Sequence, residues 1–314
     1  MKDFKFFLFI ILSGLLYSLT GSVLAFILSG IGISVLIARG KYPTAVSGAA
    51  VSLLLCGFSE MSLMASYLLA GVLPGTAIGI GYKYRLKLPT LMIAPSLCFA
   101  GQWVYVFSAY KRTNGTNLFE DFAKATLENA QASLSTAVSA AGIEVESATL
   151  ESVIEIMKQM MQVVTQLTPS MLIIFSCFMA LIIILLSKNA AYGSKVTPTG
   201  SFSEIYAPNS IIIMLGLCII GFFAKTNALK FFLANISVIM MSFFILCGVS
   251  VLDFFFRKKV PGSVARAVIY IFGSFVGFLL LPQLIIPLLV MIGTADMAFD
   301  FRRIRRTYRN GNEK

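Results

Sequence analysis

Long uncharged stretches recur along the chain and set the first expectation about its fold. The uncharged or nearly uncharged runs cover residues 6–38, 43–82, 88–110, 169–187, 207–224, 231–256 and 267–295. An α-helical membrane crossing needs about 20 mainly apolar residues, so each run approaches or exceeds the length of one crossing. The pattern therefore predicts a membrane protein with several transmembrane helices.

Three runs are too long for a single straight crossing. A continuous helix over residues 43–82 would measure about 60 Å, twice the hydrocarbon thickness, so this run must fold back once. We expect the turn at Gly57–Glu60, where glycine permits tight geometry and the run has its only carboxylate. Two prolines predict a turn or a broken helix at Leu281–Gln283 in run 267–295. Run 6–38 forms either one long tilted helix or two short ones.

Composition excludes a water-soluble domain. The chain is 58% hydrophobic and 12% charged, with a mean hydropathy of +0.87, and a soluble core could not bury that much apolar surface. The predicted fold class is all-α, a polytopic transmembrane bundle of about 8 to 10 crossings with some half-helices. The stretch before Phe6 resembles a signal sequence, but the apolar run is too long and lacks a cleavage site, so we expect it to be retained.

Basic residues between the runs predict the orientation, because Lys and Arg near helix ends concentrate on the cytoplasmic side. Segments able to cross twice separate successive basic clusters, so all clusters can lie in the cytoplasm. The clusters are Arg39 with Lys41; Lys83, Arg85 and Lys87; Lys188 with Lys195; Arg257 to Lys259; and Arg302 to Arg309. The net charge of +11 then indicates anionic lipid headgroups of the bilayer as partners, and no nucleic acid.

Residues 111–168 form the one sizeable stretch that does not resemble a membrane segment. They contain seven of the fourteen acidic residues and few basic ones, which predicts an extracytoplasmic insert. Apolar positions recur at helical spacing over its second half and predict an amphipathic helix. These positions are Leu150, Ile154, Met157, Met161 and Val164. We expect this helix to lie back on the bundle or on the membrane surface; the alternative is a lid or a partner-docking element.

The resulting division of the chain has four parts. Residues 1–110 are the amino-terminal transmembrane helices, 111–168 the insert, 169–300 the carboxy-terminal transmembrane helices, and 301–314 a basic cytoplasmic tail. Small residues at every fourth position indicate faces where helices pack closely, either within the bundle or against a partner protein. These glycines are Gly71, Gly75 and Gly79 in one run and Gly273 with Gly277 in another. Packing within the bundle is the expected use.

Ionisable residues at membrane depth are costly, and they single out Glu60, Asp253, Arg266 and Asp296. For Glu60 we expect a wet external turn, and a binding role is the alternative. At the carboxyl end, Asp296, Asp300 and Arg303 fall on successive helical turns and predict an ion-pair ladder. Together with Arg302, these residues are expected to anchor the last helix at the interface.

Several kinds of chemistry are absent from the sequence. The chain has no histidine, which excludes Ser-His catalysis and the usual zinc sites. Its five cysteines lie singly in apolar segments, as small buried hydrophobes do. No P-loop motif is present, so any ATP-driven step must come from another subunit. We therefore expect no metal, no cofactor and no enzymatic activity.

Three stretches resemble the YybS-like family of uncharacterised bacterial membrane proteins. They are Ile33–Lys87, the acidic insert after Asn114–Asn117, and above all the ending Gly293–Arg303. That family is distantly similar to the substrate-binding components of energy-coupling-factor transporters, which borrow a transmembrane coupling protein and ATPase subunits. The resemblance implies a bacterial plasma membrane protein, but it carries no substrate-contacting residue onto this chain.

Two functions remain open at this point. The first is a non-enzymatic membrane subunit that binds or moves a small solute in a pocket within the bundle. Its expected lining is Glu60, Gln102, Trp103 and Tyr105, all towards the outer half. The second is a membrane scaffold or assembly factor that recruits proteins through its small-residue faces and its external helix. A membrane enzyme ranks third, because the sequence offers no nucleophile paired with a base.

Overall fold

The computed structural model describes residues 3–141, 147–192, 202–205, 211, 213, 214, 216, 226–260 and 282–302. Within these residues the secondary structure is helical and contains no strand, which confirms the all-α fold class. The predicted sites Arg266, Gly273, Gly277 and Arg303, and the predicted turn residue Leu281, lie outside the described residues.

The described helices follow one another with short connections in the amino-terminal half. They are α1 (Phe4–Thr20), α2 (Val23–Ala38), α3 (Tyr42–Ser59), α4 (Met61–Tyr67), the π-helix η1 (Leu68–Val72), α5 (Leu73–Lys83), α6 (Leu88–Asn114), α7 (Leu118–Ala141), α8 (Ser147–Tyr192), the 3-10 helix η2 (Phe202–Glu204), α10 (Asn227–Lys259) and α12 (Pro282–Phe299). Five segments of the described chain are long and apolar enough to cross a membrane. Three more, α1, α2 and most of α12, are shorter apolar helices.

Two local breaks divide the long amino-terminal runs. Run 6–38 is two helices, because Gly21 adopts φ +63° and ends α1 while the Ser22 hydroxyl accepts the Leu24 N–H and begins α2. Run 43–82 folds back as its length predicts. The break falls at Glu60, whose extended backbone (φ −164°, ψ 137°) separates α3 from α4.

A π-helical turn joins α4 to α5 into one apolar segment, Met61–Lys83. Pro74 stands at the start of α5 and has no N–H to donate to the preceding turn. In an α-helix its ring would also clash with the carbonyl four residues earlier. The wider turn, in which the Leu73 N–H donates to the Leu68 carbonyl, lets the segment continue past this proline.

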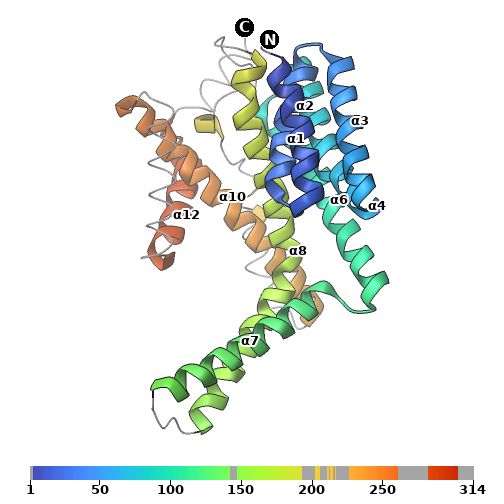
Figure 1. Ribbon diagram of the computed structural model, residues 1–314. Helices are drawn as coiled ribbons and strands as arrows, with labels where there is room; N and C mark the ends of the chain where they lie inside the picture. The colour runs from blue at the N-terminus through green and yellow to red at the C-terminus, as the bar shows by residue number, and fades with distance from the viewer. Residues whose placement is uncertain are drawn as a thin grey trace.

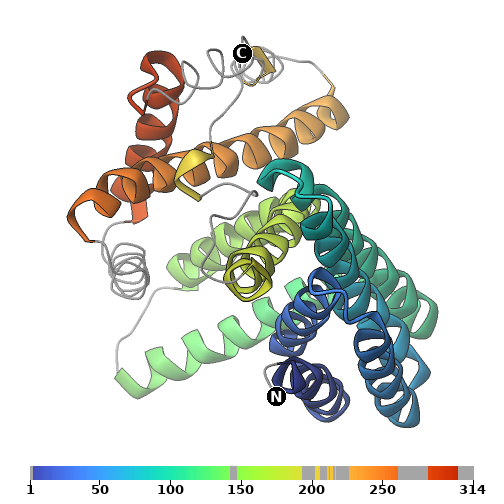
Figure 2. The ribbon, with the colours of Figure 1, turned by 90° about the horizontal axis from the view of Figure 1, so that it is seen from above.

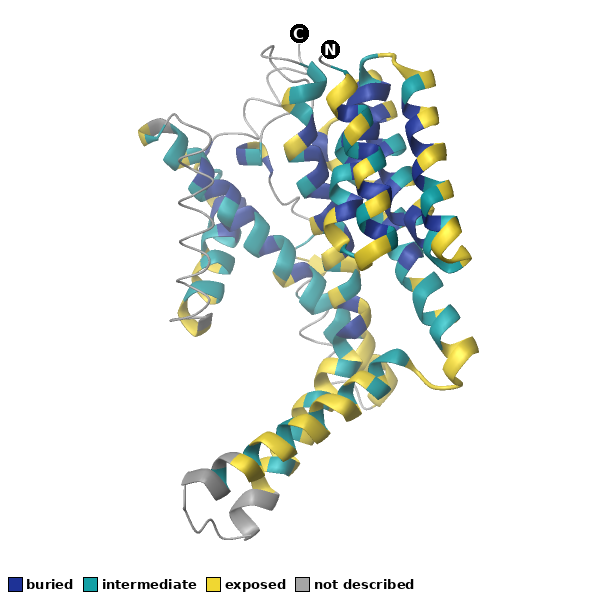
Figure 3. Ribbon diagram, in the orientation of Figure 1, coloured by how far each residue is buried: buried dark blue, intermediate teal, exposed yellow. Residues whose placement is uncertain are grey.

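The amino-terminal helices pack into one bundle together with the carboxy-terminal half of α8 (Figure 1). Buried side chains concentrate inside this bundle, as the dark blue residues in Figure 3 show. Tyr67 and Tyr82 are among the largest fully buried side chains. Viewed from above, α8 lies between the α1–α6 group and the pair formed by α10 and α12 (Figure 2). The α8–α10 contact includes the Asn235 amide, which donates to the Gln166 carbonyl and accepts the Ser170 N–H, each at 3.0 Å.

The 111–168 segment contains the end of α6, α7 and the first part of α8. The α7–α8 hairpin extends away from the bundle, so the expected placement of its helix back on the bundle is wrong (Figure 1). α8 has 46 residues, which corresponds to about 69 Å, and it passes Pro169 without interruption. A single helix, α8, therefore runs from the outer hairpin into the bundle.

Candidate functional site

A small cavity lies within the bundle, bounded by α1, α2, α6 and α8. Its volume is about 170 Å³, and two of the predicted pocket residues, Gln102 and Trp103, line it. The other lining side chains are apolar or aromatic apart from the phenol of Tyr17, and none of the described lining residues is charged. This lining fits a small uncharged molecule better than an ion.

Polar groups on α6 give the cavity its chemistry. The Gln102 side chain is buried, with the residue 6% exposed, and its amide donates to the Ser66 hydroxyl at 3.0 Å. The Trp103 ring stacks on Phe107 and meets Phe175 edge-on. Its indole nitrogen is buried and has no hydrogen-bond partner in the described part of the chain. A buried donor without a partner costs about 1 to 3 kcal/mol.

The structure does not bring the other two predicted pocket residues into this cavity. Tyr105 is two positions after Trp103, and two helical positions correspond to a rotation of about 200°, so the two side chains leave α6 on different sides. Glu60 is exposed at the α3–α4 break and accepts a hydrogen bond from the Ser62 hydroxyl. Its carboxylate therefore lies on the surface of the helical bundle and not in the cavity.

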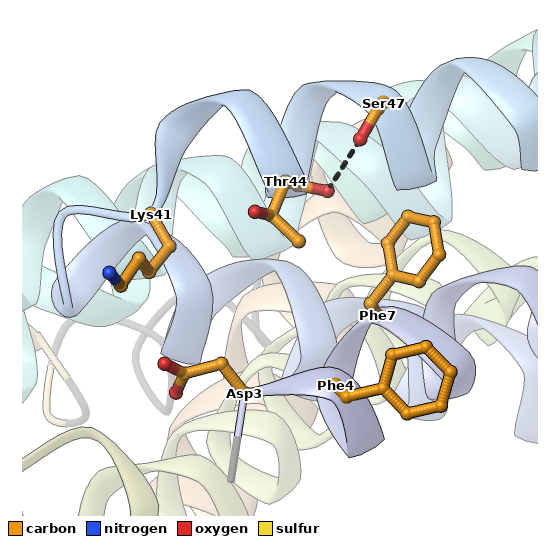
Figure 4. Close-up of a pocket in the computed structure, with 6 residues that line it drawn as sticks. All are labelled: Asp3, Phe4, Phe7, Lys41, Thr44 and Ser47. Carbon is orange, nitrogen blue, oxygen red and sulfur yellow. Dashed lines mark hydrogen bonds between the residues drawn. The ribbon is translucent and has the colours of Figure 1, made fainter. Parts of the chain in front are cut away.

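A second hollow, with a volume of about 450 Å³, lies at the surface between the first turns of α1 and α3 (Figure 4). Asp3, Lys41 and Thr44 form its polar part, and the rings of Phe4 and Phe7 form its apolar part. The hollow lies at the end of the bundle where α1 and α3 begin. A polar part beside an aromatic part suits an amphiphile such as a phospholipid.

Hydrogen bonds from Arg39, Lys83 and Tyr192 join helix ends at that end of the bundle. Arg39, which follows α2, donates to the Asp3 carboxylate at 2.5 Å and to the Ala190 carbonyl of α8 at 2.6 Å. The Lys83 amine, at the end of α5, donates to the Tyr42 hydroxyl of α3 at 2.8 Å. The Tyr192 hydroxyl donates to the Tyr82 carbonyl at 2.7 Å.

The most highly connected buried charge is Arg302, whose side chain is 0% exposed. All five of its N–H groups have acceptors, with donor–acceptor distances between 2.6 and 3.1 Å. Two bonds go to the Asp296 carboxylate, two to the carbonyls of Ser203 and Ile205, and one to the Ser250 hydroxyl. Arg302 thus joins the end of α12 to α10 and to the η2 segment.

Of the predicted ladder of Asp296, Asp300 and Arg303, only the first two residues are described, and Asp296 pairs with Arg302. α12 ends at Phe299, and Asp300 takes the left-handed conformation with φ +47°. The chain turns there, so it is Arg302 that returns to Asp296, six residues earlier, and the pair is buried. Asp253, the other suspected acid of this region, pairs with Arg257 one helical turn later at 3.0 Å.

The predicted glycine face on η1 and α5 points at α2 inside the bundle. A Cβ added to Gly75 would lie 3.0 Å from the Gly30 Cα, and one added to Gly79 would lie 2.7 Å from the Ile37 Cβ. A Cβ added to Gly71 would lie 3.3 Å from the Ser29 hydroxyl of α2 and 3.3 Å from the Tyr67 ring. These helices approach closely because no side chain stands between their backbones.

Sequence reasoning missed a polar network inside the bundle. The hydroxyls of Tyr67 and Ser13 lie 2.6 Å apart, and the Ser52 hydroxyl donates to the Ile10 carbonyl at 2.7 Å. All of these side chains are buried, so the network connects α1, α3 and α4 in the apolar interior. A serine or tyrosine within an apolar run is common, and the small-residue spacing that includes Ser52 predicts helix packing and no polar network.

Neither a metal cluster nor a disulfide is found in the described ranges. The family model described as "Predicted membrane protein (DUF2232)" matches residues 6–297, nearly the whole chain. No curated protein and no solved structure matches the chain.

Proposed function

Because the chain belongs to the DUF2232 family of predicted membrane proteins, we propose that it is a non-enzymatic membrane subunit that binds or moves a small solute. The observation that carries the proposal is the 170 Å³ cavity beside Gln102 and the unpaired indole N–H of Trp103. An apolar cavity with a few polar groups is the usual form of a small-molecule site.

The lining favours one chemical class of solute. Aromatic side chains from α2, α6 and α8 suit an apolar or aromatic body, and the Trp103 N–H suits a carbonyl or ether oxygen. The absence of charge among the described lining residues argues against an ionised ligand, which would lose its hydration without compensation.

Replacing Trp103 by phenylalanine is expected to weaken solute retention about tenfold, because the ring remains while its N–H is lost. Small molecules extracted from the purified protein would be compared by mass spectrometry between wild type and variant. The matched control is Tyr105→Phe, which also changes one polar group on α6 but lies off the cavity. Equal retention in Trp103→Phe and wild type would contradict the proposal, as would wild-type protein that carries no molecule.

The resemblance to the YybS-like family, and through it to energy-coupling-factor transporters, extends the proposal to partners. A binding subunit of that kind works with a coupling transmembrane protein and ATPase subunits. Such partners would copurify from native membranes.

We place the basic end of the bundle in the cytoplasm and the α7–α8 hairpin outside. The Arg39–Ala190 and Lys83–Tyr42 contacts support a common basic end, and the positive-inside rule gives its side. Lys41 and the hollow of Figure 4 would then face the anionic headgroups of the inner leaflet.

Cysteine labelling tests this orientation. In a chain without its native cysteines, Ser133→Cys on exposed α7 is expected to react with an impermeant maleimide in intact cells. Arg85→Cys, in the exposed loop after α5, is expected to react only after permeabilisation. Labelling of both positions from the same side would overturn the orientation.

One observation favours the rival function of a scaffold or assembly factor. The α7–α8 hairpin leaves apolar side chains of α8 exposed, including Ile156 and Met160. Surfaces of this kind commonly bind other proteins.

A further inference from the structure

Four apolar side chains form an exposed stripe on the outer part of α8, which we call the hairpin seam. Its members are Val153, Ile156, Met160 and Val163, with 38%, 56%, 65% and 52% of their surfaces exposed. Figure 3 shows how little of the hairpin is buried compared with the bundle.

The seam is distinct from the face of α8 that packs on α7. Ile154, Met157 and Met161 are half-buried in the hairpin and already have a neighbouring helix. On a helix the seam lies about 100° from that face, on the adjacent side. α8 therefore has two apolar faces, of which α7 covers one.

The spacing of the seam identifies the kind of surface that would cover it. Intervals of three, four and three residues are the a and d positions of a heptad, the pattern by which one helix packs knobs into the holes of another. The positions beside the seam are uncharged. They are Ser152, Met157, Gln159, Val164 and Gln166. A helix with the same sequence can approach this face without like-charge repulsion at its edges.

Charge disfavours a membrane surface as the cover. A helix that lies on anionic lipid carries Lys and Arg beside its apolar face. The outer part of α8 has Glu155 and Lys158, which lie within ion-pair distance of each other at 4.0 Å. This segment therefore offers anionic lipid little net attraction.

We propose that the hairpin seam joins this chain to further copies of itself through a parallel coiled coil of α8. Copies inserted in one membrane share an orientation, so their α8 helices run parallel with the same residues at the same height. The seam is short, but membrane anchoring raises the effective concentration of the partner helix. α7 packs along this part of α8, so the helix is formed before it meets its partner.

Disulfide crosslinking tests the proposal in membranes that contain the full chain without its native cysteines. Val163→Cys is expected to give a crosslinked band of twice the chain mass on mild oxidation. Lys158→Cys, an exposed position outside the seam, is the matched control and is expected to give none. Adding Ile156→Glu and Met160→Glu to Val163→Cys is expected to reduce the crosslinked band at least tenfold.

Three crosslinking results would overturn the proposal. They are equal crosslinking at positions 158 and 163, no crosslinking at position 163, and a crosslinked product containing a different protein. A fluorescent label on Val163→Cys that is quenched by lipid-borne quenchers would also overturn it, because the seam would then lie on the bilayer. The cavity variant Trp103→Phe is expected to crosslink normally, so the solute proposal and this one fail separately.

Discussion

Replacing Arg302 by methionine is expected to destabilise the packing of α10 and α12 by about 3 to 5 kcal/mol, because it leaves a buried charge without its partner. The Asp296 carboxylate, 6% exposed, loses both of its bonds from the guanidinium. The carbonyls of Ser203 and Ile205 lose donors at the same time. Methionine fills a similar volume, so the loss of stability measures the missing hydrogen bonds and charge and not a cavity.

Thermal unfolding of the detergent-solubilised protein and protease cleavage near η2 would measure this effect. Lys158→Met is the control, because Lys158 and its partner Glu155 are 50% and 61% exposed and such exposed pairs contribute about 0 to 1 kcal/mol. Combining Asp296→Asn with Arg302→Met removes the stranded charge and is expected to recover part of the loss. Equal unfolding temperatures for Arg302→Met and Lys158→Met would contradict the role of Arg302.

The role of Arg302 could not be deduced from its neighbours in sequence. It stands in a basic tail, where the usual expectation is interfacial anchoring. Its acceptors Ser203 and Ser250 lie 99 and 52 residues earlier, and only the folded chain brings them together. The helical spacing rule assumes that the helix continues through Asp300, where the structure has a left-handed residue.

Hydropathy did predict the features that depend on length alone. A 40-residue apolar run cannot cross a bilayer once, and the chain does fold back at Glu60. The same approach marked a change of composition at Thr168 and Pro169, but α8 continues through both residues. Amino-acid composition changes where the surroundings of the chain change. The backbone hydrogen bonds of a helix can continue across that point.

The candidate pocket shows a similar limit. Gln102 and Trp103 are adjacent in sequence and both reach the cavity. Glu60 and Tyr105 were grouped with them by depth in the membrane, which says nothing about the direction in which a side chain leaves its helix. Phe26 and Met179 complete the lining from two other helices, and no pattern in the sequence connects them to α6.

Replacing Gly248 by valine is expected to cost about 3 kcal/mol or more, because α10 and α12 touch there through their backbones. A Cβ on Gly248 would lie 2.2 Å from the Leu289 carbonyl oxygen, and one on Gly293 would lie 2.3 Å from the Phe244 carbonyl oxygen. A backbone carbonyl cannot rotate away as a side chain can, so the helices must separate. Neither glycine belongs to a small-residue repeat that the sequence analysis identified. The contact uses one glycine from each helix, so no repeat appears within either helix.

Unfolding temperature is again the measurement, with Gly101→Ala as the control. Gly101 lies inside α6 with no atom within 4 Å of an added Cβ, so alanine there is expected to stabilise the helix by about 0.5 to 1 kcal/mol. Gly293→Val alone should resemble Gly248→Val. The double variant should add little to either, because one separation of the two helices relieves both clashes. Additive losses would mean that the glycines act at independent contacts, and wild-type stability in Gly248→Val would mean that α10 and α12 do not meet at this point.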